Sequence, residues 1–175
     1  MARAAPVGLN LAMPIVPLTN DNWGFTTNCF VCESRNESGL RIPYFHDVDA
    51  QLVYAEFELD DRFSGAPTWA HGGVSLAICD EAMAWATIAI HHTWAVTKES
   101  TAAFDRPIVI GRRYRCEARI DSVNDEHIAT VATITAIESA KTCVRTTATM
   151  SVLSALQAPS LGISLIGEHE DYLRP

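Results

Sequence analysis

The sequence lacks an apolar run long enough for a membrane helix. Its longest apolar stretch, residues 74–90, contains two acids, Asp80 and Glu81, and is shorter than the about 20 residues that a transmembrane helix needs. The N-terminal segment is rich in small residues, but Pro6, Gly8, Asn10, Pro14 and Pro17 interrupt the continuous apolar region that a signal peptide requires. We therefore expect a soluble protein with no membrane contact.

Positive charge is also scarce. Lys and Arg total 13 against 21 Asp and Glu, which gives a formal net charge of −8. This balance argues against a general nucleic-acid binder, and any patch that serves an anionic ligand must be local.

The sequence shows no evident set of disulfide-bonded cysteines, because it has five cysteines, an odd number. Three of them, Cys79, Cys116 and Cys143, lie in runs that read as buried helix or strand. This usage favours reduced thiols and a cytoplasmic protein.

No repeat, low-complexity tract or linker divides the chain. With 175 residues and 48% hydrophobic content, it suits one domain with a single core. We expect an irregular lead-in over residues 1–27, a folded domain over 28–157 and a tail over 158–175.

The central stretch, residues 70–90, reads as a helix buried on most sides, because nearly all its residues after two glycines are apolar or small. An ionised carboxylate in such surroundings costs several kcal/mol unless it is paired or hydrogen-bonded. Asp80 and Glu81 are therefore the first candidates for a functional role.

Around this helix the sequence alternates as strands do. The pattern predicts an α+β fold in which a curved antiparallel sheet of five to six strands wraps around one long helix. The expected strands cover residues 41–47, 51–60, 98–106, 112–120, 127–138 and 142–156.

A Cys-x-x-Cys pair, Cys29 and Cys32, precedes the first expected strand. Structural zinc wants four ligands, and the nearest further candidate, His46, would bring the set to only three. We interpret the pair as packed or exposed thiols and predict no metal.

Several segments in the same order resemble the hotdog-fold thioesterases, in particular the branch typified by the phenylacetic-acid-pathway (PaaI-like) enzymes. They are the loop 63–67, the His-Gly-Gly at 71–73, the acid Asp80 and the Arg-Pro strand at 104–108. The Cys-x-x-Cys segment 28–40 is similar to a lead-in found in some members. The likeness covers roughly residues 28–155.

The resemblance implies a hotdog fold, homodimers that sometimes pair into tetramers, and an active site contributed by two chains. It further implies an acyl-CoA or acyl-carrier thioester as substrate and no cofactor.

The helix start is the expected oxyanion site. Free backbone N–H groups and partial positive charge gather there, and Gly72 and Gly73 would let a thioester oxygen approach without side-chain obstruction. The alternative is that both glycines only allow a tight turn. His71 would bind the carbonyl or hold the loop.

The resemblance makes Asp80 the general base or nucleophile, with a structural ion pair as the alternative and Glu81 as the second choice. Thr97 matches a position that places the attacking water or the acid in some members. Ser100 and Thr101 remain alternatives because that match crosses a loop.

The sequence departs from the family in the loop before His71. Ser64 and Gly65 stand where members often carry an amide side chain that contacts the substrate. Arg113 is a candidate for the phosphates of coenzyme A, although its strand parity equally fits a solvated face.

The predicted function is hydrolysis of an acyl-CoA thioester. Two alternatives remain open: a hotdog protein that binds acyl thioesters without cleaving them, and a hotdog hydratase or dehydratase acting on enoyl or hydroxyacyl thioesters.

Overall fold

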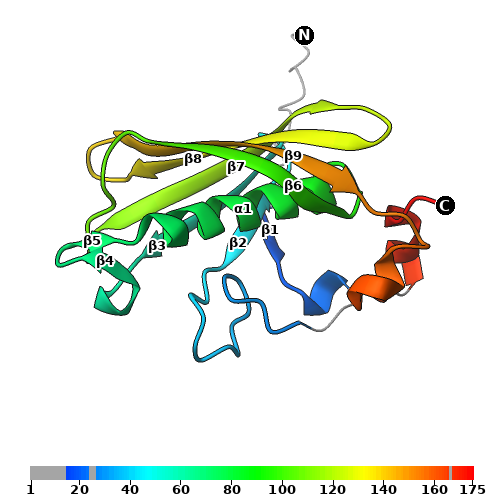
Figure 1. The fold of residues 1–175 in the computed structure, drawn as a ribbon, viewed down its shortest axis with the longest axis horizontal. Helices are drawn as coiled ribbons and strands as arrows, with labels where there is room; N and C mark the ends of the chain where they lie inside the picture. The colour runs from blue at the N-terminus through cyan, green and yellow to red at the C-terminus, as the bar shows by residue number, and fades with distance from the viewer. Residues whose placement is uncertain (1–14, 24–26, 166) are drawn as a thin grey trace, which may run out of the picture.

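The protein is described by a computed structural model that covers residues 15–23, 27–165 and 167–175. A seven-stranded antiparallel sheet forms one layer, and α1 (Gly72–Ala89) lies across one of its faces (Figure 1). The sheet order is β1-β2-β3-β7-β8-β9-β6. Its strands are β1 (Ile15–Leu18), β2 (Tyr44–Asp47), β3 (Leu52–Glu58), β6 (Ala95–Phe104), β7 (Arg113–Val123), β8 (His127–Ala136) and β9 (Thr142–Val152).

This architecture confirms the predicted α+β hotdog fold, with one strand more than the five to six expected. The additional strand is β1, which lies in the lead-in that the sequence suggested was irregular and pairs with β2. Pro17 argued against a strand in the sequence. An edge strand needs hydrogen bonds on one side only, however, and so tolerates proline. The rest of the expected lead-in, residues 1–14 and 24–26, lies outside the described residues.

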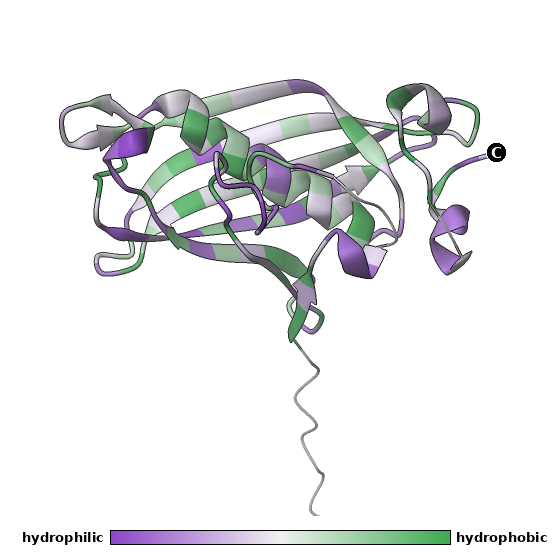
Figure 2. Ribbon diagram, turned by 90° about the horizontal axis from the view of Figure 1, so that it is seen from below, coloured by the Kyte–Doolittle hydropathy of each residue, from purple (hydrophilic) through white to green (hydrophobic). Residues whose placement is uncertain are grey.

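The core forms where the apolar side of α1 meets the sheet. Ile78, Ala82, Met83 and Ala86 of the helix are fully buried, and the Tyr44 hydroxyl donates to the Ile78 carbonyl at 2.9 Å. Figure 2, turned by 90° from Figure 1 so that the molecule is seen from below, shows the helix lying along the sheet. The described residues contain no helix that is long and apolar enough to cross a membrane.

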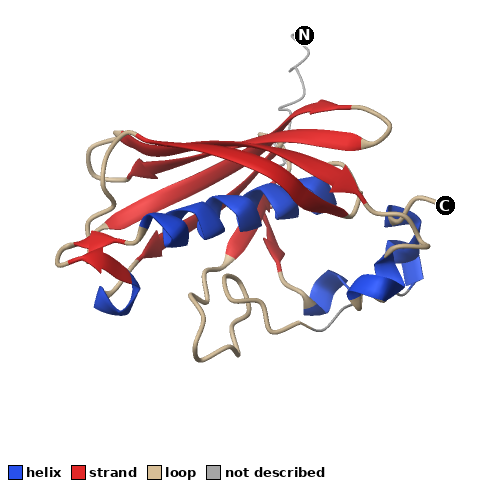
Figure 3. Cartoon of the chain, in the orientation of Figure 1, coloured by secondary structure: helices blue, strands red, loops and turns tan. Residues whose placement is uncertain are grey.

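The C-terminal segment covers the end of α1. Two 3-10 helices, Ala158–Leu161 and Gly167–Tyr172, lie there (Figure 3). The backbone N–H of Trp94 donates to the Tyr172 carbonyl at 3.1 Å. The ring centres of Trp23 and Tyr172 lie 5.5 Å apart. The segment therefore closes the core at the point where the helix exits.

The other edge of the sheet is β6, which pairs with β9 and with no other strand among the described residues. Most of its residues are exposed, including Val96 and Phe104. A long exposed edge strand presents unpaired backbone groups that a second chain can bind.

Candidate active site

His71 caps the start of α1. Its ring Nδ1 accepts a hydrogen bond from the Gly73 N–H at 2.9 Å, and its carbonyl accepts from the Val74 N–H at 3.0 Å. An accepting Nδ1 carries no proton, so the neutral ring carries its proton on Nε2. His71 is exposed, and the Nε2–H can therefore donate to a bound molecule.

This cap changes the predicted oxyanion site. The sequence suggested the N–H groups of both Gly72 and Gly73, but the Gly73 N–H is already bound to His71. The Gly72 N–H has no hydrogen-bond partner within the described ranges. The available donors at the helix start are thus the Gly72 N–H and the His71 Nε2–H.

The loop before His71 is held by its own contacts. The Ser64 hydroxyl donates to the Asp61 carbonyl at 2.7 Å, and the loop forms a small hairpin of β4 (Ser64–Ala66) and β5 (Trp69–Ala70). A Cβ on Gly65 would lie 2.8 Å from the Cα of His71, closer than real Cβ contacts. Gly65 therefore lets the loop pack directly against the capping histidine, while substrate contacts by Ser64 and Gly65 stay predictions.

A surface pocket of about 260 Å³ opens at the helix start. It is lined by Gly72 and Ser75 of α1, by Phe104 at the end of β6, and by Arg106 in the following loop. The Ala70 N–H donates to the Ile108 carbonyl at 2.8 Å, which ties the entering chain to that loop. The pocket therefore gives a small ligand access to Gly72.

Asp80 contacts the predicted threonine. The Thr97 hydroxyl on β6 donates to the Asp80 Oδ1 at 2.6 Å and lies 3.5 Å from the Met150 sulfur. The two alternatives lie further along β6, where Ser100 and Thr101 line a separate pocket with Asp121. The structure thus brings Asp80 together with Thr97.

Glu81 points to a different part of the fold. Its carboxylate lies with the thiols of Cys29 and Cys32, all within 4.8 Å of one another. Burial raises the pKa of Glu81 to about 8, and the negative charge of Cys29 adds to the rise. Adjacent helical residues point about 100° apart, so Asp80 and Glu81 serve separate clusters.

Arg113 is paired on the sheet. Its guanidinium donates to the Glu56 carboxylate at 2.8 Å, and Arg115 binds the same carboxylate at 3.2 Å. Arg145 makes a two-pronged ion pair with Asp105 at 2.7 and 2.9 Å. Phosphate binding by Arg113 stays a prediction, and it would compete with Glu56.

Part of the chain is similar to a family of known proteins. Residues 69–143 match the family model described as the thioesterase superfamily, a stretch that includes His71, Asp80 and Thr97. No curated protein sequence matches the chain.

Solved structures share the fold. A thioesterase superfamily protein is 21% identical, with a TM-score of 0.68 over 81% of this chain and 68% of that one. A Streptococcus mutans protein bound to acetyl-CoA is 22% identical, with a TM-score of 0.55 over 58% of this chain and 81% of that one. The Escherichia coli PaaI protein of the phenylacetic acid degradation operon is 17% identical, with a TM-score of 0.56 over 59% and 74%. The predicted resemblance to hotdog thioesterases is therefore confirmed.

Proposed function

We propose that this protein hydrolyses an acyl-CoA thioester to a free acid and coenzyme A. The observation that carries the proposal is Asp80, a carboxylate on a largely apolar helix that is held at 2.6 Å by Thr97. A general base needs a fixed orientation and access to water, and Asp80 is only partly buried.

The reaction follows from two groups with opposite roles. Donors at the helix start, the Gly72 N–H and the His71 Nε2–H, stabilise the negative oxygen that forms when the carbonyl is attacked. Asp80 accepts a proton from water as the water oxygen bonds to the carbonyl carbon. The C–S bond then breaks, and the departing thiolate takes up the proton. Direct attack by Asp80, through an anhydride that water later cleaves, is the second form of the same chemistry.

A complete site requires two copies of the chain. Gly72 and Asp80 are eight positions apart on one helix, and a rise of 1.5 Å per residue places them about 12 Å apart along its axis. This distance is too great for both to act on one carbonyl carbon. The exposed edge of β6, which carries Thr97, is where a second copy would join. A homodimer, with further pairing into tetramers, is part of this proposal.

Similar structures support the substrate class. The Streptococcus mutans protein was solved with acetyl-CoA, and a hypothetical thioesterase from Streptococcus pneumoniae was solved with coenzyme A. The latter protein was also solved with an aspartate or a threonine replaced by alanine. These are the residue types that meet here as Asp80 and Thr97.

Free-thiol release from a panel of aliphatic and aromatic acyl-CoA substrates tests the function. The wild type should release thiol, and Asp80→Asn should abolish release while circular dichroism shows an intact fold. Glu138→Gln, an exposed acid in the turn between β8 and β9, is the matched control and should retain activity. Thiol release that is unaffected by Asp80→Asn would contradict the proposal.

Binding without cleavage is the second candidate. It is favoured by Ser64, whose hydroxyl is engaged by Asp61 and so leaves one possible carbonyl contact unmade. An acyl-CoA that binds tightly to the wild type and is not cleaved would select this function. A change in double-bond absorbance without thiol release would instead select the hydratase class.

A further inference from the structure

Three metal-ligating groups from two distant segments meet beside α1. Cys29 and Cys32 come from the loop before β2, and Glu81 comes from the helix. One sulfur or oxygen atom of each lies within 4.8 Å of the other two. None of these groups contacts Thr97 or the helix start, and the proposed hydrolysis does not use them.

The backbone around Cys29 favours a thiolate. The N–H groups of Val31 and Cys32 donate to the Cys29 sulfur at 3.3 and 3.4 Å. Such a sulfur is ready to act as a ligand, because metals bind thiolates and not thiols.

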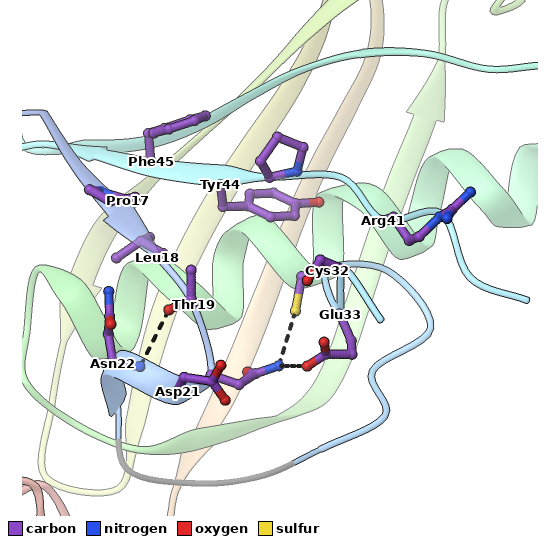
Figure 4. Close-up of a pocket in the computed structure, with 13 residues that line it drawn as sticks. Pro17, Leu18, Thr19, Asp21, Asn22, Cys32, Glu33, Arg41, Tyr44 and Phe45 are labelled. Atoms are coloured by element: carbon purple, nitrogen blue, oxygen red, sulfur yellow. Dashed lines mark hydrogen bonds between the residues drawn. The ribbon is translucent and has the colours of Figure 1, made fainter. Parts of the chain in front are cut away.

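The neighbouring groups orient the cluster. The buried Asn20 side chain donates to the Cys32 sulfur at 3.8 Å and to the Glu33 carboxylate at 3.4 Å (Figure 4). Glu33 is in turn fixed by Arg35, whose Nε donates at 2.8 Å. Supporting contacts of this kind hold ligands in place at metal sites.

From this geometry we propose that Cys29, Cys32 and Glu81 bind a divalent cation of the zinc class. Two sulfurs and one carboxylate oxygen suit a borderline-soft ion that prefers tetrahedral coordination. A cation would also relieve the crowding of three acidic groups. The proposal does not depend on the hydrolase function.

Such a site would keep one coordination position open. Three protein ligands leave a tetrahedral ion one ligand short. The space for a fourth ligand is a cavity of about 190 Å³, which is lined by Cys29 and Glu81 together with Thr27 and Trp85. The Trp85 indole N–H is buried without a hydrogen-bond partner among the described residues. Water or a small anion would complete the coordination.

Glu81 distinguishes a metal site from a redox pair. Disulfide formation between Cys29 and Cys32 would need an oxidant and no carboxylate. The structure contains both cysteines as free thiols. A cation can use the carboxylate as a third ligand, whereas the disulfide bond itself contains no carboxylate.

Titration of the reduced, metal-free, full-length protein with Co²⁺ tests the site. One equivalent should produce thiolate-to-cobalt charge-transfer absorption and the visible bands of a tetrahedral ion, and Zn²⁺ should bleach both. Zn²⁺ should also raise the thermal unfolding midpoint, because a ligand that binds the native state stabilises it.

Substitutions distinguish the three proposed metal ligands from residues that only surround them. Cys29→Ser and Cys32→Ser should lose the charge-transfer absorption, and Glu81→Gln should shift the visible bands and weaken binding. Asn20→Ala should weaken Co²⁺ binding by about tenfold to a hundredfold. Cys143→Ala removes a buried thiol outside the cluster, and Asp80→Asn removes the neighbouring acid; both should bind Co²⁺ as the wild type does.

Two outcomes would overturn the metal site. One is a reduced wild type with no charge-transfer absorption. The other is absorption that survives in both serine variants, since the cobalt would then be bound elsewhere. Loss of hydrolysis in Asp80→Asn with unchanged Co²⁺ binding would keep the metal site and the hydrolase function distinguishable.

Discussion

Two neighbouring acids, Asp80 and Glu81, have different partners. Asp80 accepts a short hydrogen bond from Thr97 on the edge strand, whereas Glu81, about 100° further around the helix, lies with two thiols. The sequence could rank them only by resemblance, because both stand in the same apolar run. Their partners, which lie 17 residues away for Asp80 and in the loop before β2 for Glu81, explain how the helix tolerates both.

Thr97→Val tests how Asp80 is oriented. The substitution keeps the side-chain shape and removes a hydrogen bond to a charged group, which is worth about 1.5–3 kcal/mol. We expect kcat to fall by about ten- to a hundredfold, with KM little changed. Thr97→Ser keeps the hydroxyl and should retain most of the activity. Steady-state kinetics with an equal loss in both variants would contradict this role.

His71 has two separable tasks. Its Nδ1 caps the helix, and its Nε2–H is free to donate. His71→Asn keeps a capping side chain, whereas His71→Ala loses about 1 kcal/mol of stability. The Asn side chain is shorter than the imidazole and holds its amide N–H groups short of the Nε2 position, and Ala has no side-chain donor. Both variants therefore lose the donor at that position, and we expect kcat to fall by about a hundredfold in each.

Thermal unfolding together with thiol-release kinetics checks this pair of variants. Full activity in His71→Asn would show that the histidine acts only as a cap.

At the scale of elements, the start of α1 supplies one backbone donor where the sequence predicted two. His71 is adjacent in sequence to the helix that it caps. The sequence did not predict this cap, because histidine is not a usual capping residue. The helix and the strands β2, β3, β6, β7, β8 and β9 were predicted because each follows from a periodic pattern over several residues.

The pairings that periodicity does not encode were missed. The contact of Glu81 with Cys29 and Cys32 depends on a loop packing against a helix about fifty positions away, and no local signal marks it. Likewise, β1 forms a strand by pairing with β2, which lies later in the chain, and its own sequence does not indicate this pairing. Thr97 was found only because the resemblance supplied its spacing from the Arg-Pro strand.

Gly72→Pro removes the remaining backbone donor at the helix start. Proline is favoured at the first helical position, and His71 already has the extended backbone that precedes proline, with ψ of 133°. We expect an intact fold and a loss of about a hundredfold or more in kcat. In Gly72→Ala the N–H remains and the new Cβ makes an ordinary 3.5 Å contact with Phe104.

The alanine variant should therefore retain most of the activity. Equal thiol-release rates for the proline and alanine variants would remove Gly72 from the oxyanion site.

For the whole molecule, stability should depend on pH through a buried histidine. His46 on β2 is 8% exposed, and burial lowers its pKa, with partial opposition from Asp47. Below the ordinary value of 6.5 the unfolded state therefore binds more protons than the folded state. Stability is lost as pH falls through this range.

His46→Gln should reduce this loss. Urea unfolding at pH 7.5 and pH 5.5, which is about one unit on either side of the ordinary histidine pKa, should give a smaller difference in unfolding free energy for the variant than for the wild type. An unchanged difference would mean that His46 does not contribute.

The proposed hydrolytic site is built from two chains, with Gly72 from one and Asp80 from the other. Coexpression of Asp80→Asn and Gly72→Pro chains with different affinity tags would allow the mixed dimer to be purified and its thiol release measured. Each variant alone should be nearly inactive, and the mixed dimer should recover about half the wild-type rate, because one of its two sites is intact. A mixed dimer as inactive as its parents would show that Gly72 and Asp80 of different chains do not form one site.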